Sequence, residues 1–206
     1  MSYNYLFSLI MVGDAYVGKT ALCNSLTMGD FIPSYENTIG IEFASHKIQY
    51  TDDLIIKAHI WDTAGQEVFA PIVANYYRRC AGVFLVFDVN KRESFNRLGF
   101  WRREVMKNTD YKGISFLLIG NKVDKAEREV SYEEGSQYAE KHNMLYVETS
   151  AKKFIHIDRF FRLLISDVYN KMDKNSPGIK KGGITQLNMC EELPVEATTT
   201  TCCHMM

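Results

Sequence analysis

Residues 13–20 read Gly13-Asp14-Ala15-Tyr16-Val17-Gly18-Lys19-Thr20 and match the phosphate-binding pattern G-x-x-x-x-G-K-S/T. An apolar run over residues 5–12 precedes the pattern, and a helix-compatible run over residues 20–26 follows it. The two glycines allow backbone N–H groups to turn inward toward anionic oxygens, and the helix adds its positive N-terminal end. Lys19 can bind the outer phosphates, and the Thr20 hydroxyl can ligate Mg²⁺. We therefore expect a phosphate-binding loop rather than a turn that binds nothing.

The composition limits the classes of protein to which the chain can belong. Its 206 residues are 46% hydrophobic and 24% charged, as in an ordinary globular protein. The formal net charge of −1 argues against a nucleic-acid partner. No apolar run approaches the ~18 residues that span a bilayer, and the N-terminus lacks the basic region of a signal peptide. The five cysteines form no disulfide framework, which favours a reducing compartment.

Short apolar runs alternate with helical segments over the first 172 residues. Residues 41–50 and 54–61 are two apolar-rich runs separated by a polar turn, which is typical of a hairpin. Further strands are predicted at residues 82–88, 114–120 and 144–147, and helices at residues 93–107, 132–142 and 157–172. The pattern predicts an α/β fold: a doubly wound, mostly parallel six-stranded sheet with one antiparallel edge strand and helices on both faces. Ligands of such sheets bind at the carboxyl ends of the strands.

The character of the chain changes after Met172. The last residues contain Gly-Gly and Ser-Pro-Gly segments and a run of four threonines, which cannot form a packed core. We therefore predict one domain over residues 1–172, which we expect to be monomeric, followed by a flexible tail over residues 173–206.

A second motif, Trp61-Asp62-Thr63-Ala64-Gly65-Gln66, follows a predicted strand. Asp62 is placed to hold Mg²⁺ through a water molecule. Gly65 can offer its N–H group to a terminal phosphate without a side chain in the way, and Gln66 can orient a water nucleophile. Taken alone, this pattern is also that of a simple turn.

Two further loops at strand ends indicate which base is bound. In Asn121-Lys122-Val123-Asp124, the Asp124 carboxylate can accept two hydrogen bonds from guanine, whereas adenine would leave it unpaired. The Lys122 stem can cover the face of the base. The segment Glu148-Thr149-Ser150-Ala151-Lys152 can offer a backbone N–H group to the base carbonyl. Three such loops in this order, all at strand ends, favour a guanine-nucleotide site over chance.

Together these motifs resemble those of small GTPases of the Ras superfamily, and specifically of the Rab family. The resemblance covers about residues 5–172, with Rab-like stretches at residues 39–43, 76–78 and 85–89. It implies a P-loop G domain that switches between GTP and GDP, hydrolyses GTP to GDP and phosphate, and recruits effectors to membranes in vesicle trafficking. The segments at residues 3–7 and 132–134 resemble the Rab group of the Golgi and the early or recycling endosomes.

The resemblance also assigns roles to individual residues. It implies that Gln66, Lys19 and Gly65 are catalytic, and that Thr20, Thr38 and, through water, Asp62 hold Mg²⁺. The aromatic residues Phe43, Trp61 and Tyr76 would form an effector-binding triad. The nucleotide-binding residues would be Asp14, Ala15, Tyr16, Val17, Gly18, Lys19, Thr20, Ala21, Phe31, Tyr35, Thr38, Gly65, Asn121, Lys122, Asp124, Ser150, Ala151 and Lys152.

The resemblance further implies an exchange factor, a GTPase-activating protein, a GDP-dissociation inhibitor and effectors as partners. Ala15 stands where related GTPases have glycine, and Tyr16 takes a position where glycine or alanine is common. No arginine in the chain stands out as an arginine finger supplied in cis. We therefore expect slow intrinsic hydrolysis that depends on an activator.

The C-terminus carries the last signal. Cys202-Cys203-His204 resembles the paired-cysteine end of Rab proteins, which receives two geranylgeranyl groups, and two chains anchor a protein far more stably than one. We expect the protein on the cytoplasmic face of Golgi or endosomal membranes, with a cytosolic pool. A zinc site is a competing interpretation, but adjacent cysteines are poorly spaced for it.

Two other functional classes remain open. A GTP-binding module could switch by nucleotide exchange with very little hydrolysis, and the residues Ala15 and Tyr16 motivate that alternative. A phosphotransferase could use the same loop on a small substrate, although no acceptor-binding lid is evident. Single-turnover GTP hydrolysis separates the first from a GTPase, and a screen for phosphorylated products separates the second.

Overall fold

The computed structural model describes residues 2–32, 38, 40–65, 70–109, 111, 113–172 and 178–182. Its strands are β1 (Tyr5–Val12), β2 (Ile41–Thr51), β3 (Leu54–Thr63), β4 (Gly82–Asp88), β5 (Ser115–Asn121), β6 (Leu145–Glu148) and β7 (Ile179–Lys181). Its helices are α1 (Lys19–Thr27), α2 (Ala70–Tyr77), α3 (Arg92–Asn96), α4 (Leu98–Asn108), α5 (Tyr132–Lys141) and α6 (Ile157–Lys171). Among these described residues, no helix has both the length and the apolar character needed to cross a membrane.

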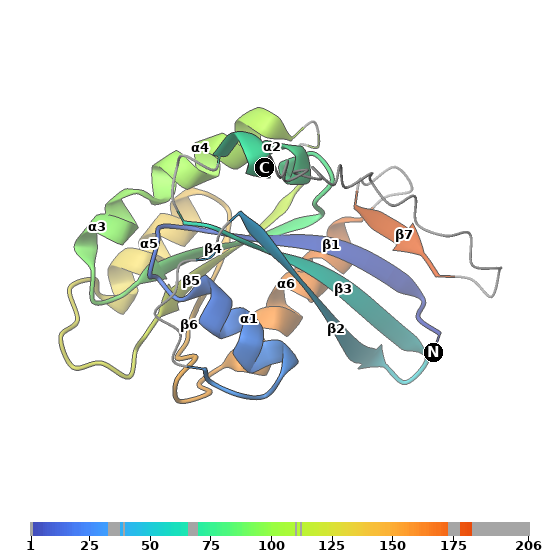
Figure 1. The fold of residues 1–206 in the computed structure, drawn as a ribbon, viewed down its shortest axis with the longest axis horizontal. Coiled ribbons are helices and arrows are strands. Elements are labelled where there is room, and N and C mark those ends of the chain that lie inside the picture. Colours follow the sequence, from blue (N-terminus) through green and yellow to red (C-terminus); the bar gives the residue numbers. More distant parts are fainter. Residues whose placement is uncertain are drawn as a thin grey trace, which may run out of the picture.

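The strands form one mixed sheet in the order β2-β3-β1-β4-β5-β6, as Figure 1 shows. Strands β3, β1, β4, β5 and β6 are parallel, and β2 pairs antiparallel with β3 as a hairpin at one edge. The short β4 begins opposite Leu9, so it pairs only with the second half of β1. The predicted fold class, with its parallel sheet and antiparallel edge strand, is confirmed.

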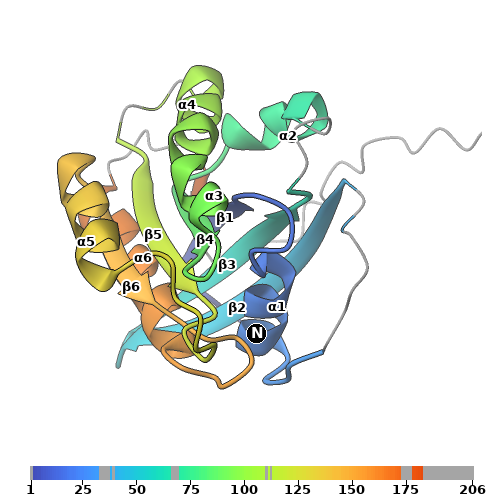
Figure 2. The same ribbon diagram turned by 90° about the vertical axis from the view of Figure 1, so that its left-hand side faces the viewer.

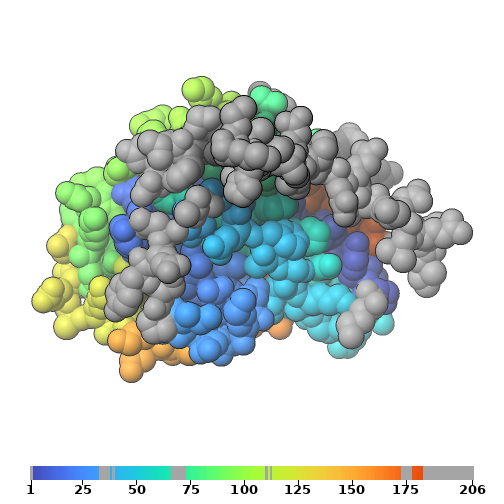
Figure 3. Space-filling view, viewed as in Figure 1, coloured from blue at the N-terminus to red at the C-terminus, as the bar shows by residue number. Residues whose placement is uncertain are grey.

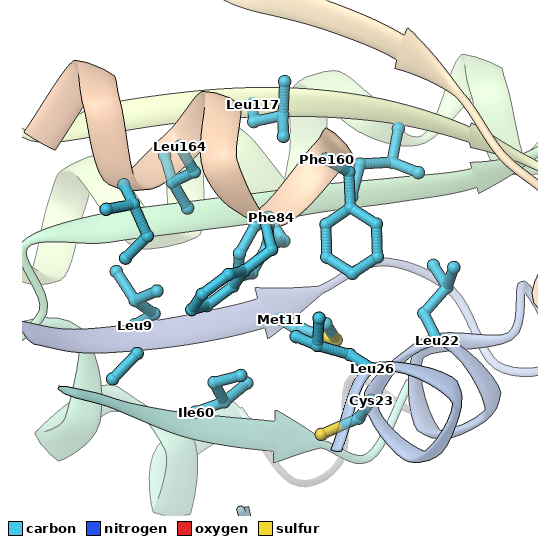
Figure 4. Close-up of a cluster of buried hydrophobic side chains, with 14 of the residues drawn as sticks. Leu9, Met11, Leu22, Cys23, Leu26, Ile60, Phe84, Leu117, Phe160 and Leu164 are labelled. Carbon is cyan, nitrogen blue, oxygen red and sulfur yellow. The ribbon is translucent and has the colours of Figure 1, made fainter. Parts of the chain in front are cut away.

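Helices cover the two faces of the sheet with separate hydrophobic cores. Helices α1 and α6 lie on one face, where Leu22, Phe160 and Leu164 meet Leu9 and Met11 of β1 (Figure 4). Helices α2, α4 and α5 lie on the other face over strands β1, β4 and β5. The turned view in Figure 2 separates α2 and α4 from α1. Because the central strands are covered on both sides, their sequences are continuously apolar, as the pattern of β4 and β5 indicated.

The helix boundaries differ from the predicted ones in two places. The predicted helix at residues 93–107 is divided at Arg97 into α3 and α4, although its apolar periodicity runs through the division. Helix α2 was not predicted, because its eight residues are short for a periodicity signal. The start of α5 matches the prediction: Ser131 and Glu134 form a capping box with hydrogen bonds of 2.9 and 3.1 Å.

A seventh strand lies within the segment predicted to be a flexible tail. Residues Ile179–Lys181 form β7, which pairs antiparallel with Tyr5, Leu6 and Phe7 of β1. This strand occupies the first half of the β1 edge, which the short β4 leaves open. The prediction of a wholly flexible tail from residue 173 is therefore wrong at β7, because its isoleucine and the sheet edge provide a packing site that composition alone does not reveal.

Candidate nucleotide-binding site

The loop at residues 13–18 connects β1 to α1 at the carboxyl edge of the sheet, and its glycines are structurally required. Gly13 has a φ of 144°, and a Cβ atom there would lie 2.2 Å from the carbonyl oxygen of Val86. Gly18 has a φ of 97°, and its Cβ would lie 2.5 Å from the side-chain nitrogen of Asn121. Any side chain at either position would therefore collide with the sheet or with the next loop.

Lys19 is the first residue of α1, and its side chain reaches back into this loop. Its ammonium group donates hydrogen bonds of 2.9 Å to the carbonyl oxygens of both Gly13 and Asp14. Only 6% of the residue is exposed, and burial lowers its pKa to about 8, although Asp62 and Asp14 oppose that shift. A buried cation whose partners here are mainly neutral carbonyl groups is well placed to gain from an anionic ligand.

The three predicted magnesium-binding residues come together beside Lys19. The Thr20 hydroxyl donates to the Asp62 carboxylate at 2.5 Å and lies 3.0 Å from the Thr38 hydroxyl. Asp62 is 2% exposed, and its second carboxylate oxygen, Oδ1, has no hydrogen-bond partner. Burial raises the pKa of Asp62 to about 6, while the bond from Thr20 and the charge of Lys19 oppose this.

This group of oxygens fits Mg²⁺, which prefers hard oxygen ligands and keeps several waters. The unpaired Asp62 oxygen supplies an acceptor for a metal-bound water, and two hydroxyl groups stand next to it. Within the described residues, no cluster of three His, Cys, Asp or Glu side chains could hold a metal by itself.

Gly65 brings the second motif against the phosphate loop. A Cβ atom on Gly65 would lie 2.3 Å from the backbone nitrogen of Ala15 and 2.4 Å from the carbonyl carbon of Asp14. The segment after β3 and the loop after β1 are thus in direct contact at this point. Only glycine permits such an approach, which places the Gly65 N–H group next to the loop that would hold the phosphates.

The predicted base-binding loops meet at the other end of the phosphate loop. The side chain of Asn121, 1% exposed, donates to the carbonyl oxygen of Val17 at 2.9 Å and accepts from Thr149 at 3.2 Å. Asp124 accepts a hydrogen bond of 2.6 Å from the Ser150 hydroxyl. Ser25 of α1 donates to the carbonyl of Ala151 at 3.2 Å. Three loops far apart in sequence are thus fixed against each other, with the Asp124 carboxylate held by one hydroxyl.

Lys122 links this region to the phosphate loop. Its ammonium lies 2.5 Å from the carbonyl oxygen of Tyr16 and 2.8 Å from the carboxylate of Asp88. Lys122 and Tyr16 both adopt left-handed backbone conformations, with φ values of 68° and 64°. Such conformations are unfavourable for side chains larger than those of Gly, Asn or Asp. The Tyr16 ring is 65% exposed, and hence it is not part of the core.

One contact at this site was not predicted from the sequence. The Asp14 carboxylate accepts a hydrogen bond of 2.7 Å from the indole nitrogen of Trp101 and pairs with Arg97 at 3.2 Å. Both partners come from the α3–α4 region, and Trp101 is 2% exposed. This contact attaches the phosphate loop to α4. An isolated aspartate in a loop and a tryptophan in a helix give no sequence signal that they meet.

Three aromatic side chains, from β2, β3 and α2, form a cluster at the surface. The rings of Phe43 and Trp61 lie 5.0 Å apart, and those of Trp61 and Tyr76 lie 4.7 Å apart. Phe43 is 53% exposed, which is unusual for a large apolar side chain. We call Phe43, Trp61 and Tyr76 the aromatic cluster. The three residues predicted as an effector-binding triad are therefore in contact, and their binding of effectors stays a prediction.

The remaining predicted residues are less closely tied to the site. Phe31 and Ala21 are partly buried, and both pack against the hydrophobic core on the α1 side of the sheet. Lys152 is exposed in the loop after β6. The predicted residues Tyr35 and Gln66, and the cysteines Cys202 and Cys203, lie outside the described residues.

Comparisons with known proteins agree with this geometry. Residues 8–170 match the Ras family. The chain is 39% identical to the Ras-related protein RABA1i of Arabidopsis thaliana over 175 residues, which cover 84% of this chain and 79% of that protein. It is 39% identical to RABA2a of the same plant, with 84% and 80% covered. It is 37% identical to the Ras-related protein RGP2 of Oryza sativa subsp. japonica over 180 residues, with 87% and 82% covered.

The chain therefore belongs to the Ras family. It is a Rab-like small GTPase that acts in membrane trafficking, as predicted from the sequence. As a member of this family it binds guanine nucleotide and works with regulators and effectors.

Proposed function

We propose that the chain is a Mg²⁺-dependent switch in which Thr38 and Gly65 report the γ-phosphate of GTP. The observation that carries this proposal is the convergence of Thr20, Thr38 and Asp62 beside Lys19. Thr38 follows α1, and Gly65 follows β3. With GTP bound, contacts from both residues to the γ-phosphate order the two loops. After hydrolysis these contacts are lost and the loops are released.

The chain's own groups have separate roles in hydrolysis. The Lys19 ammonium and the loop N–H groups stabilise charge on the transferring phosphoryl group. Gln66 orients the attacking water, and Asp62 holds a metal-bound water in place. Thr20, Thr38 and, through water, Asp62 would hold Mg²⁺, which would supply positive charge to offset that of the phosphates. The Ala15 methyl group belongs to the loop that contacts Gly65 and would face the γ-phosphate, which supports slow intrinsic turnover and the need for an activator.

The variant Thr20→Asn tests the metal-binding role. An amide in place of the hydroxyl misfits a tight octahedral shell, so the affinity for Mg²⁺–GTP should fall about tenfold or more. Calorimetry with GTP and GDP, each with and without Mg²⁺, measures the effect. The matched control is Thr109→Asn, a threonine just after α4 and outside the site. If Thr20→Asn binds Mg²⁺–GTP as tightly as the wild type, the hydroxyl is not a ligand.

We further propose that Cys202 and Cys203 each receive a geranylgeranyl group. The paired cysteines at the end of a polar tail support this proposal, because two chains give stable anchoring and one gives only marginal binding. The protein would then cycle between a cytosolic pool, bound to a GDP-dissociation inhibitor, and the cytoplasmic face of Golgi or endosomal membranes. An exchange factor and a GTPase-activating protein would set its nucleotide state, and effectors would bind the aromatic cluster.

Replacing both cysteines by serine should move the protein from the membrane fraction to the cytosol. The single variants Cys202→Ser and Cys203→Ser should show intermediate attachment, since one chain binds weakly. Fractionation of cells that express the tagged full-length chain measures this distribution, with Cys190→Ser as the control cysteine in the same tail. An unchanged membrane fraction for the double variant would exclude lipid anchoring and favour the zinc alternative.

A further inference from the structure

One part of the sheet surface carries a row of lysines with no helix over it. Lys47 of β2 is directly opposite Lys57 of β3, which is opposite Leu6 of β1, and Leu6 is opposite Lys180 of β7. Directly opposed residues point to the same face of a sheet, so the three lysines lie in one row, about 14 Å wide at ~4.8 Å per strand. We call Lys47, Lys57 and Lys180 the basic row. The β2 edge, cyan in Figure 3, lies at the molecular surface.

The basic row is electrostatically unfavourable in the chain as described. Like charges directly opposite each other destabilise a strand pair, yet Lys47 and Lys57 face each other. None of the three lysines has an ion pair among the described residues, although Lys57 lies over the ring of Tyr3 at 5.9 Å. The residues that alternate onto this face from β1, β2, β3 and β7 include no aspartate or glutamate. Such an uncompensated arrangement indicates an anionic partner.

The basic row continues into the aromatic cluster on the same face. Ser45 and His59 form the next opposed pair along β2 and β3, and Phe43 and Trp61 form the pair after that. Trp61 is four positions after Lys57, which is roughly 13 Å along a strand. The pKa of His59 is lowered by partial burial and by the charges of Lys57 and Lys180, so the positive field of the basic row extends to this ring. The face is therefore basic at one end and aromatic at the other.

Strand β7 brings the tail to this face. Its ends are held by hydrogen bonds from Ser8 to Gly178 at 2.8 Å and from Gly182 to Asn4 at 2.6 Å. Both glycines are tightly enclosed: a Cβ on Gly178 would lie 2.2 Å from the Arg79 carbonyl, and one on Gly182 would lie 1.8 Å from the Tyr3 carbonyl. Ile179 packs against the core between them. The sequence Gly-Ile-Lys-Lys-Gly thus fits the open edge of β1, and the rest of the tail must leave from there.

The residues after Gly182 carry the negative charge that the face lacks. Their only acidic or basic side chains, apart from His204, are Glu191, Glu192 and Glu196, with Leu193 and Val195 between them. Glu191 is nine positions after Gly182, which allows a reach of about 30 Å, twice the width of the basic row. We infer that residues 191–196 dock in cis on this face, with the glutamates on the basic row and the apolar side chains toward the aromatic cluster.

Anchoring by β7 makes this docking intramolecular. A short flexible connection gives an effective concentration in the millimolar range, so weak individual ion pairs are sufficient. The docked segment would cover part of the surface on which effectors bind, and an effector would have to displace it. This consequence rests on the proposed function, whereas the docking itself does not.

Carbodiimide cross-linking of the full-length, GDP-loaded chain tests the contact, because the reagent joins only carboxylates and amines that are already paired. In the monomer fraction, Glu191, Glu192 and Glu196 should cross-link to the basic row roughly fivefold or more often than to the exposed lysines Lys107 and Lys141. The preference should disappear in 1 M salt, where the Debye length is about 3 Å. Equal cross-linking to all lysines, or cross-links found only in dimers, would overturn the inference.

A charge swap provides the matched control. The variant with Lys47→Glu, Lys57→Glu and Lys180→Glu should lose the preferred cross-links. When Glu191→Lys, Glu192→Lys and Glu196→Lys are added to this variant, preferred cross-links should return, now between tail lysines and glutamates on the sheet face. Every variant should bind GDP as tightly as the wild type, because none of the six residues lies in the nucleotide site. If the wild-type chain itself does not bind GDP, that result counts against the proposed function and not against this docking.

A lipid surface as the occupant of the face is distinguished in the same series. Sedimentation with phosphatidylserine vesicles tests a membrane surface, using the unlipidated chain with and without the Lys→Glu changes. If the wild type shows no preferred cross-links but binds these vesicles through the basic row, the partner is lipid and the cis docking is wrong. Preferred cross-links that are restored by the charge swap would support the cis docking.

Discussion

The variant Asp124→Asn should bind GDP about 10³-fold more weakly than the wild type, because two hydrogen bonds to a charged group are lost and two donors of the base are left poorly paired. Ser150 already holds one oxygen of the Asp124 carboxylate at 2.6 Å, so the side chain is fixed for recognition before the base arrives. The same variant should bind xanthosine diphosphate better than GDP, since xanthine presents an acceptor where guanine has its amino group. Calorimetry with both nucleotides measures the change in preference.

The control for this prediction is Asp158→Asn. Asp158 is an exposed carboxylate at the start of α6 that pairs with Arg162 at 2.6 Å, outside the nucleotide site. Its loss should leave both affinities unchanged, because exposed ion pairs contribute little. A guanine preference that survives Asp124→Asn would show that recognition of the base depends on other groups.

The variant Gly65→Ala should lower the rate of GTP hydrolysis about a hundredfold, because a displacement of roughly 1 Å at a reacting centre has an effect of that size. The added methyl group would lie 2.3 Å from the Ala15 nitrogen and 2.4 Å from the Asp14 carbonyl carbon, which are both backbone atoms. Neither can rotate away, so the two segments must separate. The affinity for GDP should change little, because GDP lacks the γ-phosphate that Gly65 would contact. Single-turnover hydrolysis and GDP titration measure the two effects.

Gly99→Ala is the matched control for the added methyl group. Gly99 lies in α4, and the nearest atom to its Cβ would be a guanidinium nitrogen of Arg103 at 3.6 Å, an ordinary contact. This change should leave hydrolysis unaltered and raise the free energy of unfolding by about 0.5–1 kcal/mol, as alanine does in place of glycine within a helix. If Gly65→Ala hydrolyses GTP as fast as Gly99→Ala, the close approach to Ala15 has no role in the reaction.

The main strands and the long helices could be predicted because their signals are local. Residues 5–12 were predicted and observed as β1 with the same bounds, and the capping box at Ser131 set the start of α5. The convergence of Thr20 with Asp62 also follows from sequence logic, because parallel strands place their carboxyl ends at one edge. The phosphate loop, its lysine and the base-binding loops therefore lie where their motifs indicated.

The features that were missed depend on contacts between distant residues. Strand β7 has three residues, and only the open edge of β1 explains why it forms there. The attachment of Asp14 to Trp101 joins residues 87 positions apart, neither of which is distinctive by type. The division at Arg97 coincides with its ion pair to the same aspartate, whereas the helical periodicity of the sequence continues through it. Local patterns carry no information about such pairs.

The central claim is that the chain hydrolyses GTP at a guanine-specific site that depends on Mg²⁺. Single-turnover assays of the full-length protein with radiolabelled GTP or ATP, with Mg²⁺ present or removed by a chelator, test it most directly. We expect slow release of phosphate from GTP only when Mg²⁺ is present, and none from ATP. Equal hydrolysis of ATP and GTP, or GTP hydrolysis that is unchanged after Mg²⁺ removal, would contradict the account.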